Sequence, residues 1–279
     1  MIEPVDVLEE ITKRYGTIKR ARGCFLYTQS GTRITDLWLD NGRAILGWGA
    51  GNARMYFKNS INRGFTAVWG TNIPKKLERT LRAIFNDFAF FAFYTDKAKV
   101  DKAFLCSNMV NHKKIPVYLP WLNYGIDDNS LSESKIKKEF LSNKETCVEI
   151  VLPFSWQPAT LLAFRNSELQ PKIPLSDSMP APLCEAFCRS LYDLRLELPR
   201  RTAEDWALFD KDFAPYWHRT GPYLSYKGEK ENYHDFFIHC LEQKLLIAPS
   251  YDMFSIVPYD VNEGVFSFLR KNPFCKLLS

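Results

Sequence analysis

The stretch from Phe88 to Phe104, FAFFAFYTDKAKVDKAF, constrains the fold more than any other part of the chain. Six apolar residues are followed by Thr95-Asp96 and then by a short amphipathic run in which apolar residues lie among lysines. This order predicts a buried strand, a tight turn and a helix. In α/β proteins an anion binds at such a junction, on the free N–H groups of the helix N-terminus. Asp96, however, can cap those N–H groups itself.

Length and composition predict a globular protein with two lobes. The chain has 279 residues, of which 46% are hydrophobic and 15% aromatic, enough to bury a large core. The net charge of +5 comes from interspersed acids and bases, which is more typical of a solvated surface than of a nucleic-acid-binding one. The apolar run Phe88–Tyr94 is too short to cross a bilayer. The acidic residues 1–10 lack a charged-then-apolar leader, which predicts a cytoplasmic protein.

The sequence offers no metal ligands at a familiar spacing. Cys184 and Cys188 lie four residues apart on a predicted helix, but no second pair accompanies them. His234 and His239 lie five residues apart and so do not share a helix face. A Gly-x-Ser-x-Gly elbow, a zinc signature and a Walker loop are all absent from the sequence. These observations predict no metal site and assign no catalytic residue.

The N-terminal part predicts paired strands joined by a tight turn. Asn41-Gly42 is a hairpin signal between the predicted strands Thr35–Asp40 and Arg43–Gly47. The glycines at 47, 49 and 51 then suggest close backbone approach, although their GxGxG spacing is not that of a phosphate loop.

Two segments resemble class III aminotransferases, the family that includes glutamate-1-semialdehyde aminotransferase. The first is Asp-Leu-Trp-Leu-Asp-Asn-Gly-Arg (36–43) with the Gly-rich turn that follows it. The second is residues 218–278, which are similar to the small C-terminal domain of that family. Its matching positions, in order, are Arg219-Thr220-Gly221, Phe236-Phe237, Pro249-Ser250 and Phe254-Ser255.

The resemblance implies an α/β fold: a reduced sheet of the type I fold of pyridoxal-phosphate (PLP) enzymes, with helices on both faces, and a small α+β C-terminal domain. The expected domains are an N-terminal arm and hairpin joining the small lobe (1–50), a reduced large domain (51–205) and the small domain (206–279). Because active sites in this family form at a dimer interface, we expect a homodimer or a heterodimer with an active relative.

At the strand–helix junction the family has Ser-Gly-Thr-Glu-Ala, whose amides hold the cofactor phosphate. This chain has Tyr94-Thr95-Asp96-Lys97-Ala98, so the resemblance places Thr95, Asp96 and Lys97 at cofactor-binding positions. Thr95 replaces the glycine, and a carboxylate at Asp96 would face the phosphate. Two like charges in contact cost roughly several kcal/mol in a partly desolvated site. The alternative is that Asp96 is an ordinary helix N-cap.

Other family positions are only partly retained. Asn-Tyr-Gly (123–125) puts Tyr124 where an aromatic side chain stacks on the cofactor ring, and Leu152 replaces the glutamate of a Val-Glu-Pro strand. The predicted strand Leu194–Leu198 lacks the aspartate that pairs with the pyridine nitrogen. Lys211 is the only lysine in the short stretch 203–217 that remains where the family has its Schiff-base lysine, and it lies in a polar predicted helix.

Two residues are candidates for binding a substrate. Arg219 has the guanidinium fork that suits carboxylates and phosphates, and its alternative role is a structural salt bridge. Trp48, between the glycines at 47 and 49, is the other candidate.

The sequence leaves two main hypotheses for function. In the first, the protein has lost PLP–lysine catalysis, needs no cofactor and acts as a non-catalytic binding or partner subunit that binds neither nucleic acid nor membrane. In the second, it is a PLP-dependent aminotransferase or aminomutase-type enzyme that holds PLP or another phosphorylated ligand in an altered site, without a Schiff-base lysine. A nucleic-acid-binding protein is a third option, which a salt-dependent shift assay would reveal.

Overall fold

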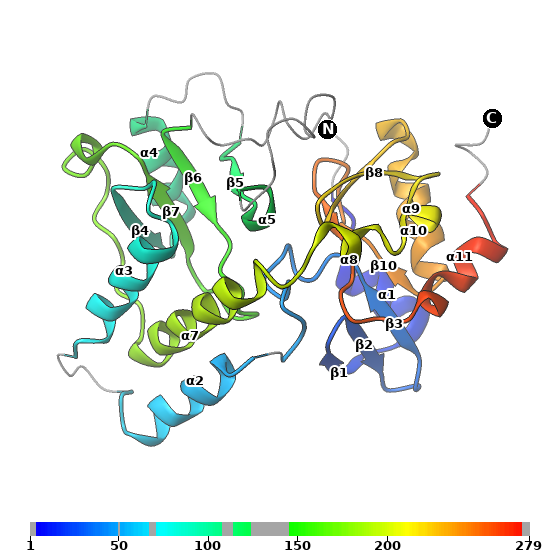
Figure 1. The fold of residues 1–279 in the computed structure, drawn as a ribbon, viewed down its shortest axis with the longest axis horizontal. Helices are drawn as coiled ribbons and strands as arrows, with labels where there is room; N and C mark the ends of the chain where they lie inside the picture. Colours follow the sequence, from blue (N-terminus) through cyan, green and yellow to red (C-terminus); the bar gives the residue numbers. More distant parts are fainter. Residues whose placement is uncertain (1–3, 50, 67–70, 108–113, 124–144, 275–279) are drawn as a thin grey trace. The chain divides into compact units, whose positions relative to one another are not determined.

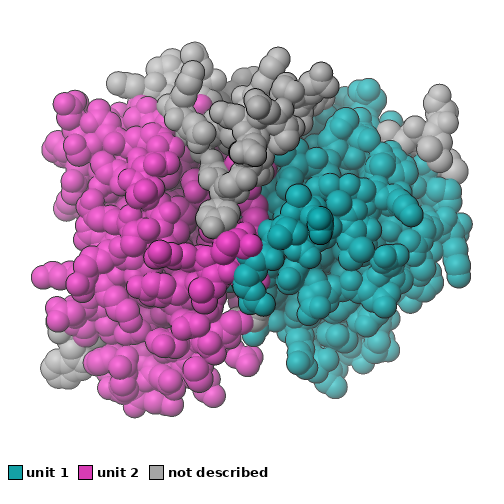
Figure 2. Space-filling view, viewed as in Figure 1, with its two compact units in different colours: residues 1–50, 200–279 teal, residues 51–199 magenta. Residues whose placement is uncertain are grey.

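The computed structural model describes residues 4–49, 51–66, 71–107, 114–123 and 145–274 (Figure 1). The chain forms two compact units, coloured separately in Figure 2. Unit 1 combines residues 1–50 with residues 200–279, and unit 2 is residues 51–199.

Unit 2 is built on a four-stranded mixed sheet with the strand order β4-β7-β6-β5. Strand β7 is antiparallel to both of its neighbours, whereas β5 is parallel to β6. The strands and helices of this unit are α2 (Ala53–Asn62), α3 (Ile73–Ile84), β4 (Phe90–Tyr94), α4 (Lys97–Cys106), β5 (Val117–Tyr118), α5 (Pro120–Asn123), β6 (Cys147–Ile150), β7 (Thr160–Phe164) and α7 (Ala181–Glu197), with a 3₁₀ turn at Ser167–Leu169.

Helices cover both faces of this sheet, which explains the unbroken apolar run in the sequence. Phe93 of β4 packs with α3 and α7 on one face. Phe90, Ala92 and Tyr94 of the same strand pack with α4 on the other. A strand buried on both faces has no polar side to alternate with. The strand, turn and helix predicted for residues 88–104 are therefore confirmed by β4 and α4.

Unit 1 contains two small sheets. The first has the order β1-β2-β3-β10, in which three antiparallel strands are joined by the parallel pairing of β10 with β3; the second has the order β11-β9-β8. Its elements are α1 (Val7–Tyr15), β1 (Ile18–Arg22), β2 (Phe25–Thr28), β3 (Arg33–Asp36), α8 (Ala203–Ala207), α9 (Asp210–Phe213), β8 (Trp217–Thr220), β9 (Tyr223–Tyr226), α10 (Tyr233–Glu242), β10 (Leu245–Leu246), β11 (Ser255–Ile256) and α11 (Ser267–Lys271), with 3₁₀ turns at Lys230–Asn232 and Glu263–Phe266.

The predicted hairpin at Asn41-Gly42 is wrong. Strand β3 ends at Asp36, whose side chain accepts hydrogen bonds from the backbone N–H groups of Trp38 and Leu39 at 2.9 and 2.8 Å. Such an Asp turn diverts the chain from the sheet. Leu39, Asp40 and Asn41 then adopt positive φ angles of 51°, 51° and 56°, so no extended strand follows in residues 43–47.

The predicted strand Leu194–Leu198 is also wrong. Residues up to Glu197 are the last turns of helix α7, and Leu198 caps that helix. The buried Leu191 and Leu194 continue the apolar face on which α7 packs, so burial of this face stabilises the helix through these residues.

Gly51, just before α2, illustrates how closely the backbone of unit 2 approaches α7. Its φ is +67°, and a Cβ added there would lie 2.4 Å from Oδ2 of Asp193. That oxygen accepts a hydrogen bond from the N–H of Asn52 at 3.2 Å. We expect Gly51→Ala to lower the free energy of unfolding by about 2 kcal/mol, combining a left-handed backbone penalty with overpacking.

Gly49→Ala is the matched control for this prediction. Gly49 has a φ of +69°, and a Cβ there would meet nothing within 4 Å. Its replacement should therefore cost only the backbone penalty, about 1 kcal/mol. Urea denaturation of both variants measures the difference, and equal losses would show that Asp193 does not restrict this position.

Candidate functional site

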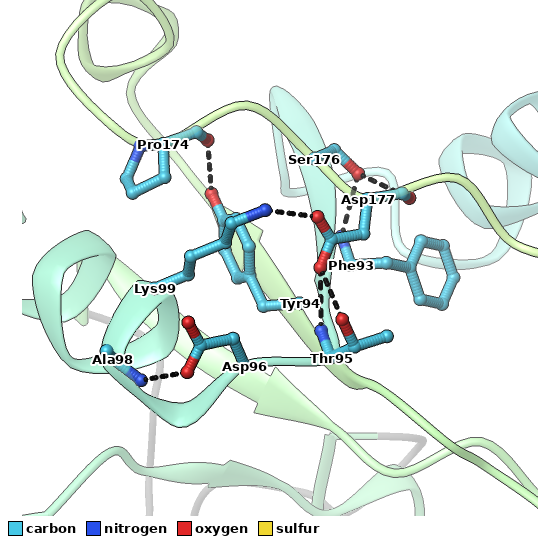
Figure 3. A network of polar contacts seen from close by, with 9 residues as sticks. All are labelled: Phe93, Tyr94, Thr95, Asp96, Ala98, Lys99, Pro174, Ser176 and Asp177. Atoms are coloured by element: carbon cyan, nitrogen blue, oxygen red, sulfur yellow. Dashed lines mark hydrogen bonds and ion pairs between the residues drawn. The ribbon is translucent and has the colours of Figure 1, made fainter.

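The candidate site is the junction where β4 ends and α4 begins, drawn in Figure 3. Asp96 has extended backbone angles, and its Oδ1 accepts a hydrogen bond from the N–H of Ala98 at 2.9 Å. Asp96 is therefore the N-cap residue of α4, the alternative that its sequence context allowed. One of the helix-start N–H groups that could bind an anion is already bound to this carboxylate.

A second carboxylate, that of Asp177, also lies at this junction (Figure 3). Its Oδ2 accepts hydrogen bonds from both the backbone N–H and the hydroxyl of Thr95, each at 2.8 Å. Its Oδ1 accepts one from the ammonium of Lys99 at 2.5 Å. These bonds, that of Lys99 first and then those of Thr95, lower the pKa of the Asp177 carboxyl to about 2. Asp177 is thus held as a carboxylate by donors from the strand end and the helix.

The segment that carries Asp177 runs along β4, which lies at the edge of the sheet. The N–H of Phe93 donates to Oγ of Ser176 at 2.9 Å, and the N–H of Asp177 donates to the carbonyl of Phe93 at 2.7 Å. The hydroxyl of Tyr94 donates to the carbonyl of Pro174 at 2.7 Å. Residues 174–177, called the strap below, therefore supply hydrogen-bond partners to an otherwise open strand edge.

The residues at this junction do not fit the phosphate of PLP. The N–H and hydroxyl of Thr95 and the ammonium of Lys99 bind Asp177, and the N–H of Ala98 binds Asp96. A phosphate placed here would lose these donors to two carboxylates and would face their negative charges. Lys97, the first residue of α4, is exposed at the surface.

The remaining positions taken from the resemblance are distributed over both units. Tyr124 lies outside the described residues. Leu152 is fully buried in unit 2, where its N–H donates to Oε1 of Gln157 at 3.0 Å. Lys211 is exposed on α9 of unit 1. In the part of the chain that the structure describes, no lysine side chain is buried.

Trp48 and Arg219, the candidate substrate-binding residues, both lie in unit 1 and both bind carboxylates of that unit. Nε1 of Trp48 donates to Oδ2 of Asp36 at 2.7 Å. Nε and Nη2 of Arg219 donate to the two oxygens of Asp210 at 2.5 and 2.7 Å, and Nη1 donates to the carbonyl of Gly221 at 3.1 Å. The salt bridge that the sequence left open for Arg219 is thus present, and its fork is already filled.

Asp36, the partner of Trp48, is a buried carboxyl with an unusual pKa. Its side chain is 1% exposed, and burial raises its pKa from 3.8 to about 6, while the hydrogen bonds from Leu39, Trp48 and Trp38 oppose the rise. No local sequence pattern around Asp36 indicates that its carboxyl is buried.

The described residues contain no group of three or more His, Cys, Asp or Glu side chains placed to hold a metal ion. Within the same residues, no helix is long and apolar enough to span a membrane.

Sequence comparisons find relatives but no family description. No family model matches the chain. An uncharacterized protein of Treponema pallidum (strain Nichols) is 26% identical, covering 89% of this chain and 91% of the relative. An uncharacterized protein of Borreliella burgdorferi is 25% identical, covering 91% of this chain and 88% of the relative.

Solved structures similar to this chain include several aminotransferases. Ornithine δ-aminotransferase of Plasmodium falciparum has a TM-score of 0.62 at 12% identity, covering 91% of this chain and 92% of that one. Acetylornithine aminotransferase of Elizabethkingia anophelis has a TM-score of 0.59 at 10% identity, covering 97% and 99%. An omega-transaminase of Thermomicrobium roseum has a TM-score of 0.60 at 10% identity, covering 97% and 94%. The predicted fold class, that of type I PLP-dependent aminotransferases, is confirmed.

Proposed function

We propose that this protein has the aminotransferase fold without PLP–lysine catalysis and acts as a non-catalytic binding or partner subunit. The observation that carries the proposal is the pair of carboxylates at the β4–α4 junction. Asp96 and Asp177 take up the donors that a phosphate would need, and they bring negative charge to the same place. Because two carboxylates lie where a cofactor phosphate would bind, we expect the protein to require no cofactor.

The lysines of the described residues support the same proposal. A lysine becomes a nucleophile for a carbonyl when desolvation or a nearby cation lowers its pKa. The described lysines are not buried, and Lys211 lies exposed on α9. These lysines therefore lack the desolvated surroundings that activate a Schiff-base lysine.

Helix α2 of unit 2 exposes three apolar side chains, Met55, Tyr56 and Ile61, which are 51%, 37% and 40% accessible. They point in different directions around the helix and do not form one face. The expected association with a second chain therefore rests on the resemblance to enzymes whose active sites form at a dimer interface. We propose a homodimer or a heterodimer with an active aminotransferase in the cytoplasm, without nucleic-acid or membrane binding. Sedimentation of the protein alone and with a candidate relative measures this directly.

PLP labelling tests the proposed loss of catalysis. The purified protein is incubated with PLP, reduced with borohydride and analysed by intact mass and peptide mapping. Because the junction does not fit a phosphate, we expect PLP to label surface lysines weakly and at scattered positions. A stoichiometric adduct on one lysine would contradict the proposal.

A further inference from the structure

We infer that Asp177 is a built-in substitute for an anionic ligand: the β4–α4 junction retains the geometry of an oxyanion site, and the chain fills that site with its own carboxylate. The ligand class that it replaces is a tetrahedral oxyanion of the phosphate type. This inference rests on the proposed function, because it explains why a phosphate is not held at the position where the fold would accept one.

Three donors from two residues converge on Asp177 (Figure 3). A backbone N–H and a hydroxyl come from Thr95 at the end of β4, and an ammonium comes from Lys99 in the first turn of α4. The Asp177 side chain is 18% exposed, so solvent reaches the position from one side. A backbone N–H, a hydroxyl and a cation around one partly open point are the groups that bind a phosphate oxygen.

The strap is anchored independently of the Asp177 carboxylate. The bonds between the N–H of Asp177 and the carbonyl of Phe93, between the N–H of Phe93 and Ser176, and between Tyr94 and the carbonyl of Pro174 do not involve that carboxylate. Thr95 itself follows Tyr94, which pairs with Thr160 of β7. Removing the carboxylate should therefore leave the strap in place and expose a cup of three donors.

An ordinary surface ion pair would have a different consequence. Exposed pairs contribute little, and deleting one partner leaves a solvated charge with no new affinity. The inference, in contrast, requires a gain of function when the carboxylate is deleted. This difference makes the two explanations separable by experiment.

The experiment compares wild-type protein with Asp177→Ala and Asp177→Asn, using inorganic phosphate as the probe. Binding is measured by titration calorimetry and by ³¹P NMR at ionic strength held constant with chloride. We expect Asp177→Ala to bind phosphate at least about tenfold more tightly than wild type, because three donors are freed and one of the two carboxylates at the junction is removed, while Asp96 stays on the N–H of Ala98. Asp177→Asn should bind no better than wild type, since its amide still fills the position.

A second pair of variants identifies the site. In the Asp177→Ala background, Lys99→Met should reverse the gain, whereas Lys102→Met, an exposed lysine on the same helix, should not. In the otherwise wild-type protein, Lys99→Met should raise the pKa of the Asp177 carboxyl from about 2 toward 3.8, measured by ¹³C NMR.

The outcomes distinguish this inference from the proposed function. If Asp177→Ala gains no phosphate affinity, or if the gain survives Lys99→Met, the inference is overturned while the proposed function stands. If wild-type protein forms a stoichiometric PLP adduct, the proposed function fails whatever the Asp177 variants do. Circular dichroism of each variant confirms that it is folded, and the NMR titration of Lys99→Met tests the contact even if Asp177→Ala proves unstable.

Discussion

Replacing Phe187 with alanine should lower the free energy of unfolding by about 3 to 5 kcal/mol, the range for large aromatic side chains removed from a packed core. Phe187 is fully buried on α7, between the helices and the sheet of unit 2. Its ring lies parallel to that of Phe93 of β4, with centroids 6.3 Å apart, and edge-on to that of Phe154 at 6.0 Å. The cavity left by alanine would adjoin β4, the strand that presents Thr95 and the junction.

Urea denaturation followed by circular dichroism measures this loss. Phe187→Leu keeps most of the apolar volume and should cost only about 1 kcal/mol. Leu175→Ala is the surface control: Leu175 is 89% exposed on the strap, so its replacement should change stability by less than about 0.5 kcal/mol. A loss for Phe187→Ala no larger than that of the surface control would mean that α7 does not form the core of unit 2 as described.

The elements that could be predicted from sequence are those specified by residues within the element itself. The apolar residues 88–93 are buried on both sheet faces, and Asp96 lies one residue before a helix that its side chain caps. Both signals lie within the element that they specify. The resemblance to class III aminotransferases supplied the fold class, because family motifs reflect tertiary contacts that the pattern of a single sequence does not reveal.

The prediction of a strand at 194–198 was wrong because a short alternating pattern is compatible with both a strand and a helix. In LRLEL the leucines recur at every second residue, which favours a strand with one apolar face. In the structure Leu194 is 1% exposed and Leu196 is 59% exposed, so the alternate leucines do not share an environment. The face that α7 presents to the core is set by residues before this segment, and the helix simply continues through it.

Asp177 was missed because its role depends on tertiary structure. It lies 82 residues after Thr95, in a loop rich in proline and serine, and no local pattern indicates that the loop returns to β4. Asp36 was missed for a similar reason: its burial depends on the parallel pairing of Asp36 with Leu246 of β10, a strand from the other end of the chain. Sequence could predict that the junction has the wrong charge for phosphate, but not that a second carboxylate fills it.

The contribution of Asp36 to the stability of the protein should decrease as the pH rises from about 4 to about 7, by about 2.4 kcal/mol. The carboxyl has a pKa of about 6 in the folded protein, because it is buried, and its ordinary value of 3.8 when unfolded. Between these two values the folded state binds a proton that the unfolded state has released. The stabilisation is therefore fully present below pH 3.8 and is lost as the pH rises through about 6.

Asp36→Asn isolates this contribution, because asparagine does not titrate. The free energy of unfolding from urea denaturation is measured for both proteins over this pH range, and the difference, wild type minus variant, cancels the other groups. This difference in the free energy of unfolding should decrease as the pH rises. A difference that stays constant or increases would contradict the raised pKa of the buried carboxyl. The amide oxygen of asparagine can still accept the hydrogen bond that Trp48 donates to Asp36, so the variant can keep this contact without the charge.

Trp48→Phe, which removes a donor to the ionised form, should destabilise the protein more at pH 7 than at pH 4, by about 1.5 to 3 kcal/mol at the higher pH. That asymmetry is expected only if the indole N–H of Trp48 is bound to a carboxylate that ionises inside unit 1.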